Sequence, residues 1–153
     1  VNGSLKIEDK AVVGSAETVN GSITVGAEAD VQRGVEAVNG SLTLRQGAKV
    51  AGGLENVNGS MLVEGARVEG GIETVNGDIR LATGSHVTGG IHVEEHKSSW
   101  WKGKNSRNPR ITIEQGVTVE GPLHFERAVD LYVAPGVNLP PVEGVQPQRF
   151  TLQ

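Results

Sequence analysis

One recurring set of carboxylate and imidazole side chains in this sequence could bind a metal ion. Glutamate recurs every 18 or 19 residues, each time directly after an aliphatic residue, and two histidines then take the same position: Glu17, Glu36, Glu55, Glu73, His92 and His124. If successive repeats stack, neighbouring members lie about 5 Å apart. Glu73, His92 and His124 could then hold a divalent ion such as Zn²⁺, for which two imidazoles and a carboxylate are a common ligand set. The alternative is a solvated row whose repeated charge discourages side-by-side aggregation of sheets.

A second set, of indoles and cations, is concentrated in residues 94–110. This segment holds Trp100, Trp101, Lys97, Lys102, Lys104, Arg107 and Arg110, with Glu94 and Glu95 as its acidic residues. Five cations and two carboxylates give it a net charge of +3. Because the whole chain has a net charge of −4, the other residues together carry −7. Such a loop could bind a glycan or an anionic envelope component such as a lipid headgroup. Alternatively, the indoles fold back over an aliphatic flank. Nucleic acid is not expected as a partner, because the chain as a whole is acidic.

An internal repeat predicts the elements that position these side chains. The triplet Val-Asn-Gly begins at Val1, Val19, Val38, Val57 and Val75, in steps of 18, 19, 19 and 18 residues. Each unit has three short stretches in which every second residue is aliphatic, separated by corners that contain glycine. This period of two favours strands over an amphipathic helix. Because the similarity lies one whole repeat away, equivalent strands should stack in parallel register.

The repeat therefore predicts an all-β fold, a single-stranded parallel β-helix of about seven coils of 18–19 residues. Two inward columns are expected, one of Leu5, Ile23, Leu42, Met61 and Ile79, the other of Val35, Leu54, Ile72, Ile91 and Leu123. A ladder of stacked amides is expected at one corner, from Asn2, Asn20, Asn39, Asn58 and Asn76. The glycine after each asparagine can take a positive φ, which a sharp corner needs.

The domain organisation follows from where the repeat changes. Residues 1–144 are predicted to form the solenoid, with the loop 94–110 inserted before a sixth coil. A looser seventh coil contains Pro135, Pro140 and Pro141, which suit a terminal coil because proline cannot donate to a ladder. Residues 145–153 are predicted to be a C-terminal cap or tail.

The recurring pattern G-[AS]-x-V-x-G-G-[LI], at Gly47–Leu54, Gly65–Ile72 and Gly84–Ile91, resembles the windings of bactofilins, polymer-forming bacterial cytoskeletal proteins. The V-N-G-[SD]-[LIM] pattern also looks like repeats of adhesin-like bacterial β-solenoids. The resemblance implies a triangular, right-handed helix without a cofactor, and a role in assembly or scaffolding at the cell envelope. A left-handed winding is the alternative, because Val1, Ile7, Val13 and Val19 follow a six-residue step.

Composition narrows the function. The 153 residues include no cysteine and 3% aromatic residues, which excludes disulfides and thiolate chemistry and predicts thin aliphatic layers. No apolar run approaches the roughly 18 residues of a transmembrane segment. We expect no enzyme activity, because one long loop does not make the groove that a carboxylate pair would need around a sugar.

The expected function is a non-enzymatic scaffold or adhesive rod that self-associates through its ends as a homo-oligomer, with ligand binding by loop 94–110 as the alternative. The chain starts inside a repeat, which leaves room for a signal peptide, lipid anchor or polar leader before Val1. A bacterial envelope or periplasmic location is favoured, with the cytoplasm as the alternative.

Overall fold

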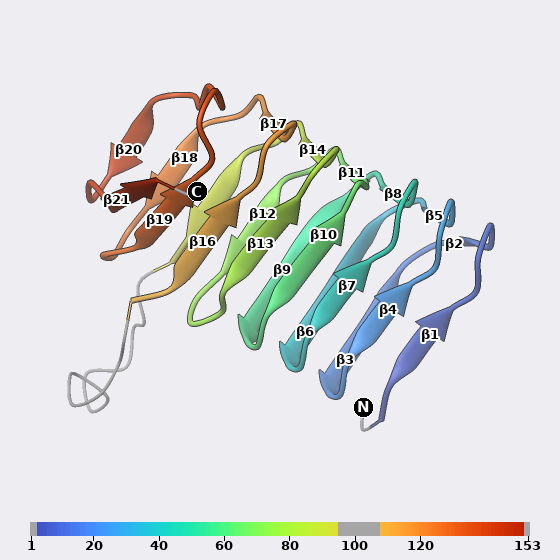
Figure 1. Cartoon of the computed structure of the whole chain (residues 1–153). Helices are drawn as coiled ribbons and strands as arrows, with labels where there is room; N and C mark the ends of the chain where they lie inside the picture. The colour runs from blue at the N-terminus through green and yellow to red at the C-terminus, as the bar shows by residue number, and fades with distance from the viewer. Residues whose placement is uncertain (1–2, 95–107, 152–153) are drawn as a thin grey trace, which may run out of the picture.

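Three parallel β-sheets wind around one core in the computed structural model, which describes residues 3–94 and 108–151 (Figure 1). The first sheet contains β1 (Leu5–Ile7), β4 (Ile23–Val25), β7 (Leu42–Leu44), β10 (Met61–Glu64), β13 (Ile79–Ala82), β16 (Arg110–Ile113), β19 (Asp130–Val133) and β21 (Gln148–Thr151). The second contains β2 (Val12–Val13), β5 (Asp30–Val31), β8 (Lys49–Val50), β11 (Arg67–Val68), β14 (His86–Val87) and β17 (Thr118–Val119). The third contains β3 (Ala16–Asn20), β6 (Gly34–Asn39), β9 (Gly53–Asn58), β12 (Ile72–Thr74), β15 (Ile91–Val93), β18 (Leu123–Phe125) and β20 (Val142–Gly144).

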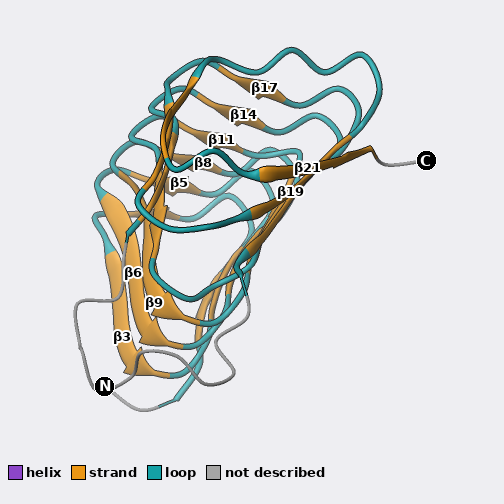
Figure 2. Cartoon of the chain, turned by 90° about the vertical axis from the view of Figure 1, so that its left-hand side faces the viewer, coloured by secondary structure: helices purple, strands orange, loops and turns teal. Residues whose placement is uncertain are grey.

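In the first six coils one strand comes from each sheet, so that β1, β2 and β3 form coil 1 and β16, β17 and β18 form coil 6. Coil 7 has β19 in the first sheet and β20 in the third. Viewed from one end, the three sheets enclose the core as the sides of a triangle (Figure 2). The predicted all-β parallel solenoid of about seven coils is thus confirmed. The described part of the chain forms strands and turns without any helix, and therefore offers none that could cross a membrane.

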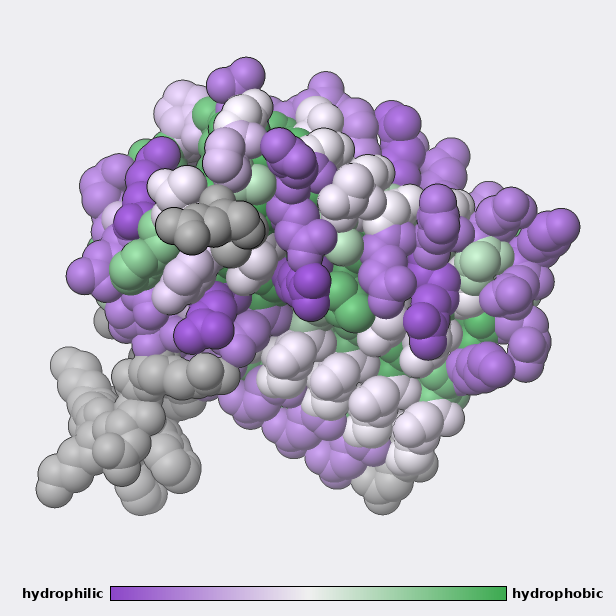
Figure 3. Space-filling view, viewed as in Figure 1, coloured by the Kyte–Doolittle hydropathy of each residue, from purple (hydrophilic) through white to green (hydrophobic). Residues whose placement is uncertain are grey.

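The predicted inward columns match the strand register. In the first sheet Leu5 pairs with Ile23, Ile23 with Leu42, and Leu42 with Met61; the third sheet stacks its own aliphatic residues in the same way. Residues of these columns in the middle of the rod are almost completely buried. Aliphatic side chains from all three sheets thereby form one continuous core, while the face seen in Figure 3 is mostly hydrophilic.

The asparagine ladder runs along the corner between the third and first sheets. The side-chain amide of Asn39 donates to Asn20 Oδ1 at 3.1 Å, that of Asn58 to Asn39 at 3.0 Å, and that of Asn76 to Asn58 at 3.1 Å. The ladder is therefore confirmed for these four residues, whereas Asn2 lies outside the described residues. At its far end Arg127 Nη1 donates to Asn76 Oδ1 at 2.6 Å.

The glycines at this corner only partly follow the expectation. Gly21 and Gly59 have positive φ angles of 152° and 134°, but Gly40 does not. A Cβ at Gly40 would overlap the carbonyl group of Gly21 in the preceding coil. Glycine is required there because two backbones approach closely, and not because of φ.

Buried polar groups beneath the corner are also paired. The Thr74 hydroxyl, only 1% exposed, donates to Asn56 Oδ1 at 2.7 Å and accepts from the amide of Gly77 at 3.0 Å. The Asn56 amide in turn donates to the Gly59 carbonyl oxygen at 3.0 Å. These hydrogen bonds stabilise the backbone of the corner from its buried side.

The segment predicted as a C-terminal cap or tail, residues 145–153, contains one strand that continues the winding. Strand β21 pairs in parallel with β19, from Asp130 with Gln148 to Val133 with Thr151. In this register the inward column of the first sheet ends with Arg149 opposite Leu131. All four residues of β21 are exposed, so the segment adds ladder hydrogen bonds and little core.

Candidate metal centre

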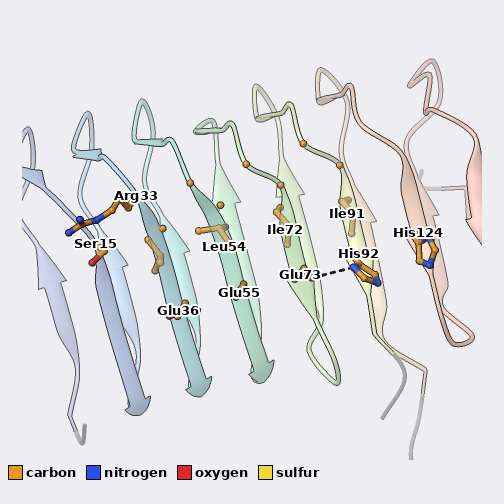
Figure 4. A pocket seen from close by; sticks show the side chains of 18 of the residues that line it. Ser15, Arg33, Glu36, Leu54, Glu55, Ile72, Glu73, Ile91, His92 and His124 are labelled. Atoms are coloured by element: carbon orange, nitrogen blue, oxygen red, sulfur yellow. Dashed lines mark ion pairs between the residues drawn. The ribbon is translucent and has the colours of Figure 1, made fainter. Parts of the chain in front are cut away.

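The strand register places the recurring glutamates and histidines in one outward row along the third sheet. Consecutive pairs join Glu17 to Glu36, Glu36 to Glu55, Glu55 to Glu73, Glu73 to His92, and His92 to His124. The row ends with Glu143, which pairs with His124. Figure 4 shows its members on successive strands, with Glu73 and His92 directed toward each other. The predicted alignment of these residues is therefore present in the structure.

A second outward row lies two residues further along each strand, on the same face of the sheet. It begins with the exposed valines Val19, Val38 and Val57, continues with Val75, and then changes to Glu94 and Glu126. Both rows therefore change residue type in the same two coils. The first row changes from glutamate to histidine exactly where the second changes from valine to glutamate.

His92 is at the centre of the resulting cluster. Its Nδ1 atom lies 3.2 Å from Glu73 Oε1, and its Nε2 atom lies 2.6 Å from Glu126 Oε2. The ring of His124 meets that of His92 edge-on, with 4.8 Å between the ring centroids. Nδ1 of His124 faces Glu143 Oε1 at 3.9 Å. Each histidine thus has a carboxylate beside its Nδ1 atom.

Two groups of three in the described part of the chain bring their potential ligand atoms within 4.8 Å of one another. One is His92, His124 and Glu126, and the other is Glu73, His92 and Glu94. The predicted set of Glu73, His92 and His124 consists of neighbours on adjacent strands, and the carboxylate grouped with both histidines is that of Glu126. The sequence contained a signal for Glu94 and Glu126, because each follows its histidine by two residues and so shares its face.

Away from the histidines, two glutamates of the first row, Glu17 and Glu55, have raised pKa values. A hydrogen bond with Glu36 and the negative charge of Glu36 raise the pKa of Glu17 above its ordinary value of 4.5. For Glu55, a hydrogen bond with Glu36 lowers the pKa. A hydrogen bond with Glu73, partial burial and the charges of Glu73 and Glu94 outweigh it, so the pKa of Glu55 is raised. This part of the row is a line of mutually repelling carboxylates.

Replacing Glu55 with glutamine is expected to stabilise the rod at pH 7. A raised pKa means that the folded chain binds more protons than the unfolded chain between pH 4.5 and the raised value, so stability falls as pH rises through that window. Because Glu55 is exposed, we expect Glu55→Gln to increase the free energy of unfolding by about 0.5 kcal/mol or less. Urea unfolding of both proteins between pH 4 and 8 measures the difference.

This difference should shrink as the pH falls toward 4.5, since a growing fraction of the Glu55 carboxylate is then protonated and loses its charge, as glutamine has none. Glu8→Gln is the control, because it removes one exposed carboxylate of coil 1 that lies outside the row. A destabilisation by Glu55→Gln that is the same at every pH would contradict repulsion along the row.

Most of the second predicted site lies outside the described residues. These are Trp100, Trp101, Lys97, Lys102, Lys104 and Arg107, and their binding of a glycan or anionic ligand stays a prediction. Arg110, assigned to the same loop from the sequence, is the first residue of β16. Its guanidinium lies 5.1 Å from the centre of the Tyr132 ring, and its backbone amide donates to Asp78 Oδ1 at 2.9 Å. Arg110 is therefore part of the first sheet.

The fold and this cluster define the chain as a triangular parallel β-solenoid with an acidic row that includes two histidines on adjacent strands. Comparisons with protein-family models, with curated proteins and with solved structures gave no match.

Proposed function

We propose that this protein is a non-enzymatic structural rod of a bacterial cell, which associates end to end with further copies of itself. The observation that carries the proposal is the uniform parallel register between coils. Each coil binds the next mainly through backbone ladders in three sheets, so a coil at the end of one rod offers the same donors and acceptors to another chain. The resemblance of the repeats to bactofilins, which form polymers, supports the same role, and so does the resemblance to adhesin-like solenoids.

The side faces favour axial over lateral assembly. The line of carboxylates from Glu17 to Glu73 runs along the third sheet, and two such lines would repel each other across a side-by-side contact. At the C-terminal end of the described chain, Arg149 and the prolines of residues 134–141 follow the last regular coil. Charge and proline both weaken strand addition at that end.

The proposed contact can be tested at coil 1, whose strands are the edge strands of all three sheets in the described part of the chain. The amide of Leu5 donates to Ser22 and the carbonyl oxygen of Ile7 accepts from Gly26, both in coil 2. Because alternate residues of a parallel strand direct their backbone groups to opposite sides, those of Lys6 point away from coil 2. Lys6 is thus the residue of β1 that a further strand would bind.

Replacing Lys6 with proline is expected to weaken association without unfolding the rod. Proline removes an N–H that makes no bond to coil 2, and proline is tolerated in edge strands. We expect the wild-type chain, with its native flanking residues, to show sedimentation coefficients that rise with concentration. In Lys6→Pro this rise should shift to concentrations at least about tenfold higher, as expected for the loss of one or two hydrogen bonds. Circular dichroism checks that the fold is kept.

Lys6→Ala is the matched control, because it removes the same charge and keeps the N–H. Equal association of the proline and alanine variants would show that the contact does not use this strand edge. A wild-type chain that stays monomeric at every concentration would overturn the proposed function.

A further inference from the structure

We propose that His92, His124 and Glu126 bind one divalent transition-metal ion of the zinc type, and that this ion fastens coil 5 to coil 6. The inference concerns a different part of the rod from the end-to-end contact and goes beyond it. Coil 5 ends with β15, which carries His92, and coil 6 ends with β18, which carries His124. Residues 94–109 separate these two coils in the sequence.

The geometry needs only side-chain movements. Around a tetrahedral Zn²⁺ ion, ligand atoms 2.0–2.1 Å from the metal lie about 3.3 Å from one another. Nε2 of His92 and Oε2 of Glu126 lie 2.6 Å apart, and all the ligand atoms of the group lie within 4.8 Å of one another. The side chains are partly exposed, with 33% exposure for His92 and 44% for His124, so small rotations meet little packing resistance.

The groups behind the histidines are those that metal sites commonly use. A histidine that binds a metal through one nitrogen usually has a carboxylate or carbonyl at the other, which fixes the ring and makes it a better donor. Glu73 lies 3.2 Å from Nδ1 of His92, and Glu143 lies 3.9 Å from Nδ1 of His124. Both carboxylates sit beside Nδ1, so the Nε2 atoms are the ones assigned to the metal. This second pair of groups distinguishes the cluster from a single histidine–glutamate ion pair.

The position of the cluster explains what the ion would stabilise. In coils 1 to 4 the asparagine ladder ties each corner to the next, and it ends at Asn76. Coil 5 leads into residues 94–110 instead of another Val-Asn-Gly corner. His92 and Glu126 are 34 residues apart, so a metal that binds both closes this interval in the folded chain. The ion would thus link coils 5 and 6, which lie beyond the last asparagine of the ladder.

The test uses ZnCl₂ added to the whole chain after treatment with a chelator. Isothermal titration should give about one Zn²⁺ per chain, and Tm should rise by about 5–10 °C at free Zn²⁺ concentrations of 100 times Kd. His124→Ala and Glu126→Gln should each weaken binding by about tenfold to 100-fold and reduce the Tm shift accordingly. Co²⁺ should give the intense visible absorption of a tetrahedral site, and His124→Ala should remove it.

His86→Ala is the matched control. His86 pairs with Glu120 on the second sheet, away from the cluster, so its loss should leave Zn²⁺ affinity unchanged. CaCl₂ separates this site from general cation binding by the glutamate row, because Ca²⁺ prefers oxygen ligands. Three results would overturn the proposal: no Zn²⁺ binding, binding that His124→Ala and Glu126→Gln leave unchanged, or Ca²⁺ binding of equal strength at the same residues.

Discussion

Gly70→Ala is expected to destabilise the rod more than any other single methyl addition in the corner between the second and third sheets. A Cβ on Gly70 would overlap the backbone carbonyl of Gly52 in the preceding coil, well inside the 3.0 Å that real Cβ contacts keep. Coils in a ladder are held about 4.8 Å apart, so the clash cannot be relieved without stretching several hydrogen bonds. We expect a loss of at least about 3 kcal/mol, the upper end for overpacked sites.

Urea unfolding followed by circular dichroism measures this loss, and a failure to obtain soluble folded protein is its extreme form. Gly14→Ala is the control. Gly14 occupies a corner in coil 1, and a Cβ there would meet only the guanidinium of Arg33, with its nearest atom at 2.9 Å. That flexible group can move away, so the control should cost less than about 1 kcal/mol. Equal losses in the two variants would refute close backbone contact as the reason for the glycine.

The second large effect is expected from Phe125→Ala. Phe125 is completely buried and is among the largest side chains of the core. It stacks on Val93 of coil 5 and pairs with Gly144 of the next coil, which leaves its ring room within the column. Removing a buried phenylalanine ring costs about 3–5 kcal/mol, because the apolar surface and the packing contacts are lost and a cavity remains. Coils 5 to 7 should bear most of this loss.

Hydrogen exchange locates the effect, since amides of coils 5 to 7 should lose protection before those of coils 2 to 4. Phe150→Ala is a natural control because the chain contains only two phenylalanines. Phe150 is 40% exposed and stacks on Tyr132 with 4.6 Å between ring centroids. Its loss should cost about 1 kcal/mol or less. A cost for Phe125→Ala as small as this would mean that coil 6 does not pack as described.

The fold could be predicted from the sequence because a repeat constrains every coil at once. Leu42 must lie over Ile23 if Asn39 lies over Asn20, and the structure shows both pairs. The strands themselves are only two to six residues long, too short to be assigned by composition alone. Periodicity at 18 or 19 residues supplied the long-range pairing that local propensity does not contain. The right-handed winding stays a prediction.

The candidate site was predicted only in part, for two physical reasons. The repeat predicts that the glutamates and histidines of the first row lie on adjacent strands. Glu126 is a candidate ligand for a different reason, because its side chain contacts His92 in the preceding coil. Side-chain directions of this kind depend on rotamers, which the repeat does not specify. Likewise, β21 continues the first sheet although its register places a charged residue, Arg149, opposite Leu131. No aliphatic pattern marks such a strand, since it is exposed throughout.

The pairing of coils 5 and 6 has a consequence for how such a rod can vary. Strands β13 and β16, and likewise β15 and β18, pair in the same register as their counterparts elsewhere, although residues 94–110 intervene. Arg127, which follows the last strand of coil 6, donates to Asn76, which follows the last strand of coil 4, and so links two corners that are two coils apart. The number of residues in the corner between coils 5 and 6 thus does not change the strand register between these coils. We therefore expect that a foreign peptide can be inserted at this corner without a change in strand register. The number of coils before the insertion then sets its position along the axis.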